Sequence, residues 1–292
     1  MIVYIFGKGY IGSKLEKYLS SKGHIVYLLA KAQVDYTNFF ELSSFFQGRS
    51  KPHYVINASG YTGIPNVDAA ENEKDLCWKY NVEVPSVLAS AIEVNKFGYL
   101  IHLSSGCIYN GYEKEYTEED TPNFGLFNSD SSFYSKTKHA AETILKNYPS
   151  YILRIRIPFS SENHSKNYFN KLFKYNKLID EKNSLTCIDD LCWFIHELMN
   201  KKNYHKSPYG IYNVVNSGYA KASDVMRLME KYGKVKTDKY EFIKLNELDT
   251  LAKRSNVILS TDKIKSEYLE LPNVMTSLEK CIREWNNGSL DS

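Results

Sequence analysis

The fold of this chain is decided near its N-terminus by the stretch IVYIFGKGYIGSKLEKYLSSKGHIVYLL, residues 2–29. An apolar strand at 2–6 is followed by a glycine-rich turn, a helical pattern to about Ser21 and a second apolar strand at 24–29. This order is the context that the dinucleotide fingerprint GxGxxG requires, because the helix N-terminus and the open turn together bind a pyrophosphate. The stretch therefore predicts a dinucleotide-binding unit whose cofactor-binding residues are Gly7, Lys8, Gly9, Tyr10, Ile11 and Gly12.

The end of the second strand bears on the choice of nicotinamide cofactor. An acidic residue at this point would bind the ribose 2′-hydroxyl of NAD. The chain instead has Ala30-Lys31, and Lys8 lies within the glycine turn. Two cations favour the 2′-phosphate of NADPH, with NADH as the other option, although both lysines could equally be solvated surface charges. Asp35 follows a few residues later and could face the adenine or cap the next helix.

Further apolar strands at 54–57, 100–103 and 151–157 alternate with helical patterns, which predicts an α/β fold with a Rossmann-type doubly wound parallel sheet. After Pro158 the alternation of strands and helices becomes less regular. We expect residues 1–158 plus 188–215 to form the NADP-binding domain and 159–187 plus 216–292 to form a smaller substrate-binding domain. Gly111 to Ser132 reads as an exposed polar loop. The small residues Asn57, Ala58 and Ser59 would let the backbone approach the cofactor, unless they form an ordinary turn.

Composition excludes several classes of protein. In 292 residues, Lys+Arg 37 against Asp+Glu 34 gives a net charge of +3, which favours neither nucleic acid nor a membrane surface. No apolar stretch is long enough to cross a bilayer, and the N-terminus lacks the features of a signal peptide. Five cysteines without a CxxC pair and seven histidines without ligand spacing predict a cytoplasmic protein without a disulfide framework or a metal.

The candidate catalytic stretch runs from Ser104 to Lys138. Ser105 and Cys107 are two apart at the end of a strand, so an extended backbone would point both to one side. Tyr134 and Lys138 are four apart on one helix face. The spacing Tyr-x-x-x-Lys occurs seven times in the chain, and only Tyr134 follows a serine-bearing strand downstream of the glycine turn. The alternative is that Tyr134 and Lys138 are an ordinary pair of side chains on the surface of a helix.

These residues suggest carbonyl reduction. We expect Ser105 to hydrogen-bond a substrate carbonyl and Tyr134 to protonate its oxygen as hydride arrives. We also expect Lys138 to lower the pKa of Tyr134 and to hold the nicotinamide ribose.

With the glycine turn, the Asn57 turn, Ser105 and Tyr134-x-x-x-Lys138, the chain resembles the extended short-chain dehydrogenase/reductases. It is most similar to the plant-type UDP-4-keto-6-deoxyglucose 3,5-epimerase/4-reductases, which make UDP-L-rhamnose. The similar segments are 57–68, 106–108, 119–124, 132–138, 153–158 and 254–256. One departure is the turn itself, since that family usually has GxxGxxG and this chain has the shorter GxGxxG.

The resemblance implies a bifunctional enzyme that epimerises C3 and C5 of a UDP- or dTDP-linked 4-keto-6-deoxy sugar and then reduces C4 with NADPH. It implies that Cys107 is the base and Lys171 the acid, although a buried apolar role for Cys107 and a solvated Lys171 are the alternatives. It also implies an upstream 4,6-dehydratase that supplies the keto sugar, and a homodimer is an option. The substrate-binding candidates are Thr62, Asn66, Arg254 and Asn256.

Two other functions stay open at this point. One is a 4-reductase alone, similar to dTDP-4-dehydrorhamnose reductase, for which Cys107 would have no use. The other is a non-catalytic, nucleotide-binding regulatory subunit of the same fold. The presence of Ser105, Cys107, Tyr134 and Lys138 together disfavours the regulatory subunit.

Overall fold

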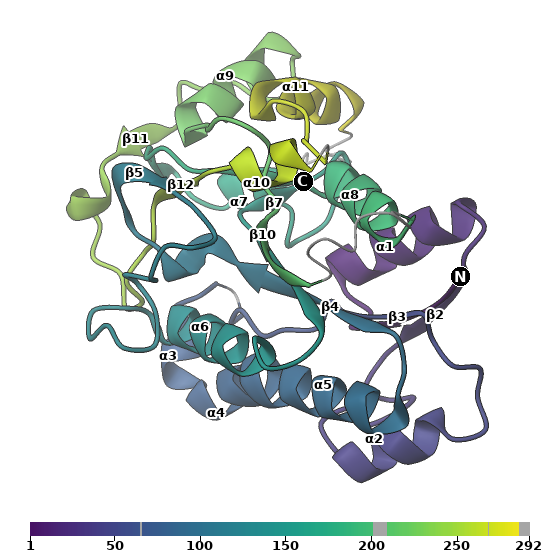
Figure 1. The fold of residues 1–292 in the computed structure, drawn as a ribbon. Coiled ribbons are helices and arrows are strands. Elements are labelled where there is room, and N and C mark those ends of the chain that lie inside the picture. Colours follow the sequence, from purple (N-terminus) through teal and green to yellow (C-terminus); the bar gives the residue numbers. More distant parts are fainter. Residues whose placement is uncertain (65, 201–208, 268, 286–292) are drawn as a thin grey trace.

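A parallel six-stranded sheet forms the centre of the computed structural model, which describes residues 1–64, 66–200, 209–267 and 269–285 (Figure 1). The strand order is β10-β6-β4-β3-β1-β2. The strands are β1 (Ile2–Phe6), β2 (Ile25–Leu29), β3 (Tyr54–Asn57), β4 (Tyr99–Ser105), β6 (Ser150–Ile155) and β10 (Gly210–Asn213). β6 is buried throughout and β4 for most of its length, as expected for strands covered on both faces. The predicted doubly wound parallel sheet is confirmed.

Helices cover both faces of this sheet (Figure 1). One face carries α1 (Tyr10–Ser21) and α8 (Ile188–Asn200), which pack against each other. The other face carries α2 (Phe39–Phe46), α5 (Val84–Asn95) and α6 (Phe133–Leu145), and the short α3 (Ala69–Asn72) and α4 (Lys74–Trp78) lie beside α6. Each face has its own apolar core, because the side chains of successive strand residues point to opposite sides.

The remaining elements form a smaller lobe above the carboxyl ends of the strands. Three short parallel pairs build it: β5 (Gly111–Tyr116) with β12 (Val257–Leu259), β7 (Pro158–Phe159) with β9 (Thr186–Cys187), and β8 (Lys177–Ile179) with β11 (Glu241–Ile243). Its helices are α7 (Tyr168–Leu172), α9 (Ala222–Lys231) and α11 (Val274–Glu284), packed around the buried Trp285. The stretch 111–132 was expected to be a loop throughout, and β5 corrects this.

One C-terminal segment packs back against the sheet. The helix α10 (Asp262–Ser266) contacts β10, and Ile264, Leu269 and Leu271 belong to the same apolar core as α1 and α8. The division into 1–158 plus 188–215 and 159–187 plus 216–292 therefore stays a prediction. Within the described residues, no helix combines the length and apolar character that a bilayer crossing needs.

A buried ion pair fixes α6 on the sheet. Arg154 on β6 donates to both carboxylate oxygens of Glu142 on α6, with its Nη2 2.8 Å from Oε2, and both side chains are 1% exposed. The Ser104 hydroxyl donates to the same carboxylate at 2.6 Å, and Arg154 also donates to Tyr109 Oη. Two charges taken out of water are tolerated only when such partners satisfy them. The network thereby sets the position of the helix that carries Tyr134 and Lys138.

Candidate active site

Ser105 and Cys107 meet at the carboxyl end of β4, but in a different way from that expected. The extended backbone ends at Ser105, and residues Gly106–Ile108 form a single 3₁₀ turn. The Ser105 hydroxyl caps this turn by accepting the Cys107 amide at 3.2 Å. The period-two argument was therefore wrong for Cys107. The turn nonetheless keeps the serine hydroxyl and the thiol beside each other.

Tyr134 and Lys138 lie on the first turns of α6, which Ser132 caps by accepting the Ser135 amide at 3.1 Å. Lys138 is 5% exposed, and its ammonium donates to the carbonyl of Leu103 on β4 at 3.2 Å. Its Nζ lies 5.9 Å from the centre of the Tyr134 ring. The helix thus brings the phenol and the ammonium to the end of the strand that carries Ser105.

Burial dominates the protonation of this cluster. It raises the pKa of Tyr134 above its ordinary value, while a hydrogen bond with Ser105 acts in the opposite direction. The net pKa of this phenol is thus raised, whereas the sequence argument expected it to be lowered, because desolvation is the largest effect; the contribution of Lys138 stays a prediction. Burial also lowers the pKa of Lys138. Tyr134 is consequently a protonated phenol, which is the form that a general acid needs.

Cys107 is 8% exposed, and burial raises the pKa of its thiol. Hydrogen bonds with Ser105 and Ser135 and the charges of Arg156 and Lys138 oppose this rise. A nearby cation favours the thiolate form of a cysteine. In the structure desolvation is the larger effect, so the thiol form prevails.

The glycine turn has the shape that a pyrophosphate requires. Gly7 has φ +111°, and a Cβ there would lie 2.5 Å from the Ser59 amide nitrogen. A Cβ on Gly12 would lie 2.0 Å from the Gly7 carbonyl oxygen, whereas a Cβ on Gly9 would meet nothing within 4 Å. No side chain caps the start of α1 and no acid lies in its first turn. A helix N-terminus of this kind can offer its first backbone amides to a phosphate.

Substitution of Gly12 and substitution of Gly9 should have very different effects on stability. We expect Gly12→Ala to destabilise the protein by about 2–4 kcal/mol, because the methyl group overlaps backbone that cannot move aside. Gly9→Ala serves as the control and should leave the free energy of unfolding within about 0.5 kcal/mol, since its methyl group points into open space. Urea unfolding of both variants measures this. Equal losses in the two variants would contradict the packing argument.

The other predicted cofactor residues divide into exposed and structural groups. Lys8 is exposed, and Lys31 is exposed with its ammonium 3.3 Å from Tyr80 Oη, a contact that raises the pKa of Lys31. Asp35 accepts from the Thr37 hydroxyl at 2.6 Å and the Thr37 amide at 3.0 Å, which lowers the pKa of its carboxyl. It stabilises the turn before α2 and does not cap that helix, whose N-cap is Asn38.

The turn after β3 is held by side-chain hydrogen bonds. Asn57 is fully buried, and its carbonyl oxygen accepts the Ser59 amide at 3.1 Å and the Ser59 hydroxyl at 2.6 Å. The same turn supplies Ala58, whose backbone lies against Gly7. The side chain of Tyr10 is already used within the protein, since its hydroxyl shares a 2.7 Å hydrogen bond with Ser160 Oγ. Ile11 is partly buried and packs on the sheet core.

Sequence reasoning missed two buried polar residues near the site. Asn81 lies in a π-helical segment, Lys79–Glu83, and its amide joins the Tyr61 backbone to the Thr137 hydroxyl of α6. Such segments are frequent at functional sites. Arg156 follows β6 directly and is 6% exposed. The interleaved arginines of an apolar strand were visible in the sequence, but only the fold shows which one is paired.

The predicted acid Lys171 lies on α7, in the small lobe. Its side chain is exposed and makes no hydrogen bond or ion pair with any residue that the structure describes. Desolvation by the surrounding protein lowers its pKa, and the neighbouring charges of Lys166 and Lys174 add to the effect. The structure records no contact between Lys171 and Cys107, so their cooperation stays a prediction.

The four substrate-binding candidates differ in how far the protein itself already uses their side chains. Thr62 is exposed, and Asn66 Nδ2 donates to Tyr175 Oη at 3.3 Å. Arg254 forms a 2.8 Å ion pair with Asp68, which leaves only part of its guanidinium for a phosphate. Asn256 is 9% exposed and accepts from the amide of Asn183, so it holds the lobe together. Their contact with a substrate is untested.

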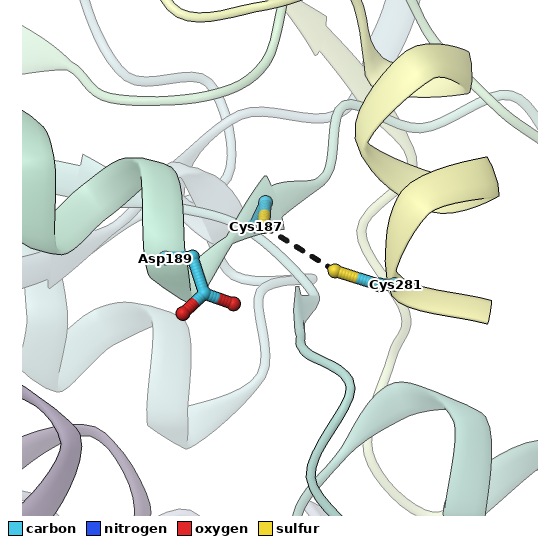
Figure 2. Close-up of side chains that lie close together, drawn as sticks. All are labelled: Cys187, Asp189 and Cys281. Atoms are coloured by element: carbon cyan, nitrogen blue, oxygen red, sulfur yellow. Dashed lines mark hydrogen bonds between the residues drawn. The ribbon is translucent and has the colours of Figure 1, made fainter. Parts of the chain in front are cut away.

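Figure 2 shows a separate group of side chains with metal-ligating chemistry, where Cys281 of α11 points toward Cys187 and Asp189. Cys187 and Cys281 have their sulfurs 3.6 Å apart, and the ligand atoms of these two cysteines and Asp189 lie within 4.8 Å of one another. Asp189 is already paired with Lys14 at 3.0 Å. The neighbouring Cys281 thiol and burial raise the pKa of Cys187, which favours the protonated form of Cys187 over a metal-ligating thiolate. We assign no metal to this group.

The doubly wound sheet, the glycine turn and the Ser105–Tyr134–Lys138 cluster define a member of the extended short-chain dehydrogenase/reductase class. Comparison with known families is consistent with this class. The sequence profile of the RmlD substrate binding domain matches residues 1–287, and the chain belongs to this family.

Two plant relatives extend the comparison. The chain is 34% identical to a bifunctional dTDP-4-dehydrorhamnose 3,5-epimerase/dTDP-4-dehydrorhamnose reductase of Arabidopsis thaliana, over 97% of this chain and 92% of the relative. It is 32% identical to a trifunctional UDP-glucose 4,6-dehydratase/UDP-4-keto-6-deoxy-D-glucose 3,5-epimerase/UDP-4-keto-L-rhamnose-reductase of the same plant. That match covers 94% of this chain but only 41% of the longer relative.

Solved structures share the fold along nearly the whole chain. The L780 UDP-rhamnose synthase of Acanthamoeba polyphaga mimivirus has a TM-score of 0.85 at 25% identity, covering 97% of this chain and 99% of that one. A dTDP-4-dehydrorhamnose reductase of Bacillus anthracis in complex with NADP has a TM-score of 0.83 at 22% identity, with the same coverage. The Rossmann-type architecture expected from the sequence is thus shared with reductases of known structure.

Proposed function

We propose that this protein reduces the C4 carbonyl of a nucleotide-linked 4-keto-6-deoxy sugar with NADPH, and that it first epimerises C3 and C5 of the same sugar. The observation that carries the proposal is the meeting of Ser105, Cys107, Tyr134 and Lys138 at the carboxyl end of β4. The family relationship supports the reductase half. Two plant relatives whose names include a 3,5-epimerase support the other half.

The residues present fit a dinucleotide. The open space at Gly9 and the uncapped N-terminus of α1 would hold the pyrophosphate, and the exposed Lys8 and Lys31 suit a 2′-phosphate. We therefore favour NADPH over NADH. When bound, NADPH supplies the hydride for C4. Lys138, whose ammonium lies at the end of β4, would hold the nicotinamide ribose.

Reduction places negative charge on the carbonyl oxygen, and the chain offers two groups to receive it. The Ser105 hydroxyl would donate a hydrogen bond to this oxygen as charge develops. Tyr134 would then transfer its phenolic proton to the oxygen. The buried ammonium of Lys138 stabilises the phenolate that remains, and solvent subsequently reprotonates it.

Epimerisation needs a base on one face of the sugar and an acid on the other. The C4 ketone makes the hydrogens at C3 and C5 acidic, because the electron pair left behind enters an enolate. Cys107 as thiolate would accept the carbon-bound proton, and Lys171 would return a proton to the opposite face. A 4-reductase without epimerase activity is the second candidate. The observation that favours it is that Lys171 is exposed and that its side chain forms no hydrogen bond or ion pair with the described residues.

Deuterium incorporation separates these two candidates. We expect the protein in heavy water, without NADPH, to place deuterium at C3 and C5 of UDP-4-keto-6-deoxyglucose. Cys107→Ser should reduce this exchange by about 100-fold, because the hydroxyl is a far weaker acid than the thiol. The same variant should still reduce a supplied 4-keto-rhamnose sugar with NADPH. If the wild-type protein shows no deuterium exchange at C3 and C5, the epimerase proposal is refuted and the protein is a 4-reductase only.

The nucleotide and the source of the substrate are part of the same proposal. Parallel assays with UDP- and dTDP-linked keto sugars determine which nucleotide is accepted. The substrate class requires a 4,6-dehydratase reaction upstream, since that reaction oxidises C4 to the ketone and, with loss of water, reduces C6 to the methyl group.

A further inference from the structure

Two arginines lie near the end of β6, and their surroundings differ in charge. Arg154 is paired with the carboxylate of Glu142. Arg156 donates from Nε and Nη2 to the Asn183 side-chain oxygen at 3.1 and 2.6 Å, and also to the Ser255 carbonyl. Neither acceptor carries a charge, and within the described ranges Arg156 forms no ion pair. A guanidinium that is 6% exposed and lacks a counter-charge is costly to bury, which makes Arg156 a candidate for a role beyond packing.

The position of Arg156 points to that function. Ser105 on β4 pairs with Ile155 on β6, so Arg156 and the turn that carries Cys107 leave neighbouring strands at the same level. The next residue, Ile157, has φ +37°, a conformation that a β-branched side chain rarely adopts. Strain of this kind is concentrated at functional sites. The sharp bend directly after Arg156 keeps its side chain under the small lobe, beside Asn183 and Ser255.

The groups around Cys107 leave few sources of positive charge. Ser105 and Gly106 come from the end of β4 and its turn, and Tyr134, Ser135 and Lys138 come from α6. Tyr112 on β5 faces Arg156. Among the described groups that affect the thiol, Arg156 and Lys138 are the cationic ones, and Lys138 also donates to the Leu103 carbonyl.

We infer that Arg156 is a positioning residue for epimerisation, whose unpaired guanidinium stabilises the anion formed at Cys107 when the thiol loses its proton. This role rests on the proposed epimerase function and deepens it. Burial lowers the pKa of Arg156 to about 10, so the side chain remains charged at neutral pH. A cation close to a thiol favours the thiolate, which is the form that can accept a proton from C3 or C5.

The thiol titration tests this role without any substrate. The absorbance of the Cys107 thiolate is obtained as the difference between each protein and its Cys107→Ser counterpart. We expect Arg156→Met to raise the apparent pKa of Cys107 by about 1–2 units, which corresponds to a 10- to 100-fold smaller thiolate fraction at neutral pH. Arg156→Lys should restore most of the loss, because it retains the charge. Lys136→Met is the control. It removes a cation from α6, the helix that carries Tyr134 and Lys138, and should leave the titration unchanged.

A second variant keeps the test valid if Arg156→Met fails to fold. Asn183→Asp retains both acceptor contacts to Arg156 but supplies the missing counter-charge. It should therefore raise the pKa of Cys107 as Arg156→Met does. An unchanged titration in folded Asn183→Asp or Arg156→Met overturns the inference. A shifted titration in a protein whose wild type shows no deuterium exchange shows that Arg156 acts on the thiol but refutes the epimerase proposal, and with it the role in epimerisation. An unchanged titration in a protein that does exchange deuterium refutes the role of Arg156 alone, so the two failures are distinguishable.

Discussion

Replacing Tyr134 with phenylalanine should lower the rate of NADPH-dependent reduction by about 10²- to 10⁴-fold, the usual contribution of a positioned general acid. The substitution removes only the hydroxyl that would protonate the sugar oxygen. Because burial raises the pKa of Tyr134, the phenol stays protonated through neutral and mildly alkaline pH. The rate should thus show no loss from Tyr134 ionisation below its ordinary pKa of about 10. The decrease in NADPH absorbance with the keto sugar at saturation measures the rate.

A second tyrosine provides the control for this result. Tyr148 lies just beyond the C-terminus of α6, with its hydroxyl 3.1 Å from Ser90 Oγ and away from the Ser105 cluster. We expect Tyr148→Phe to retain the wild-type rate, because only a peripheral hydrogen bond is lost. Binding of NADPH, followed by its fluorescence, should be similar in both variants. If Tyr134→Phe turns over within a few-fold of the wild type, another group donates the proton.

Replacing Glu142 with glutamine is expected to reduce the free energy of unfolding by about 3–5 kcal/mol. The variant retains the shape of the side chain but leaves the guanidinium of Arg154 buried without its counter-charge. It also weakens the hydrogen bond from Ser104, which lies one residue before the catalytic serine candidate. Urea unfolding with an unchanged m-value measures the loss. A smaller rate of reduction should accompany it, since α6 carries both Tyr134 and Lys138.

An exposed ion pair tests whether burial causes this effect. Lys231 and Glu279 are 2.9 Å apart on the surface, with their side chains 61% and 35% exposed. We expect Lys231→Met to change the stability by less than about 1 kcal/mol, because water stabilises each partner alone. A loss below about 1 kcal/mol for Glu142→Gln would show that solvent or another group compensates Arg154.

Local sequence patterns were sufficient for the βαβ framework. Apolar runs bounded by glycines predicted β1, α1, β2 and β3 within a residue or two, because each element is specified by side-chain period and turn chemistry over short distances. The same patterns were insufficient for the small lobe. Its strands are only two to six residues long and pair with segments far away in the chain, as β5 does with β12.

The protonation states of the site were also beyond sequence reasoning. The types and spacing of Ser105, Cys107, Tyr134 and Lys138 were visible, but the spacing suggested a lowered pKa for the phenol. Desolvation depends on everything that packs around a group, and here it raises the pKa of both Tyr134 and Cys107. The sequence likewise showed two arginines interleaved in an apolar stretch, without indicating that Arg154 has a counter-charge and that Arg156 has none among the described residues.

The amino-acid sequence by itself determined the dinucleotide-binding framework and the chemical groups available at the end of β4. Both follow from local rules, since a glycine turn and an amphipathic period act on neighbouring residues. Only the tertiary structure decided which charges are paired, how Cys107 reaches Ser105 through a 3₁₀ turn, and that Arg156 is buried with no carboxylate partner among the described residues. These features arise from contacts between segments distant in the chain, and such contacts are fixed only when the two lobes are folded together.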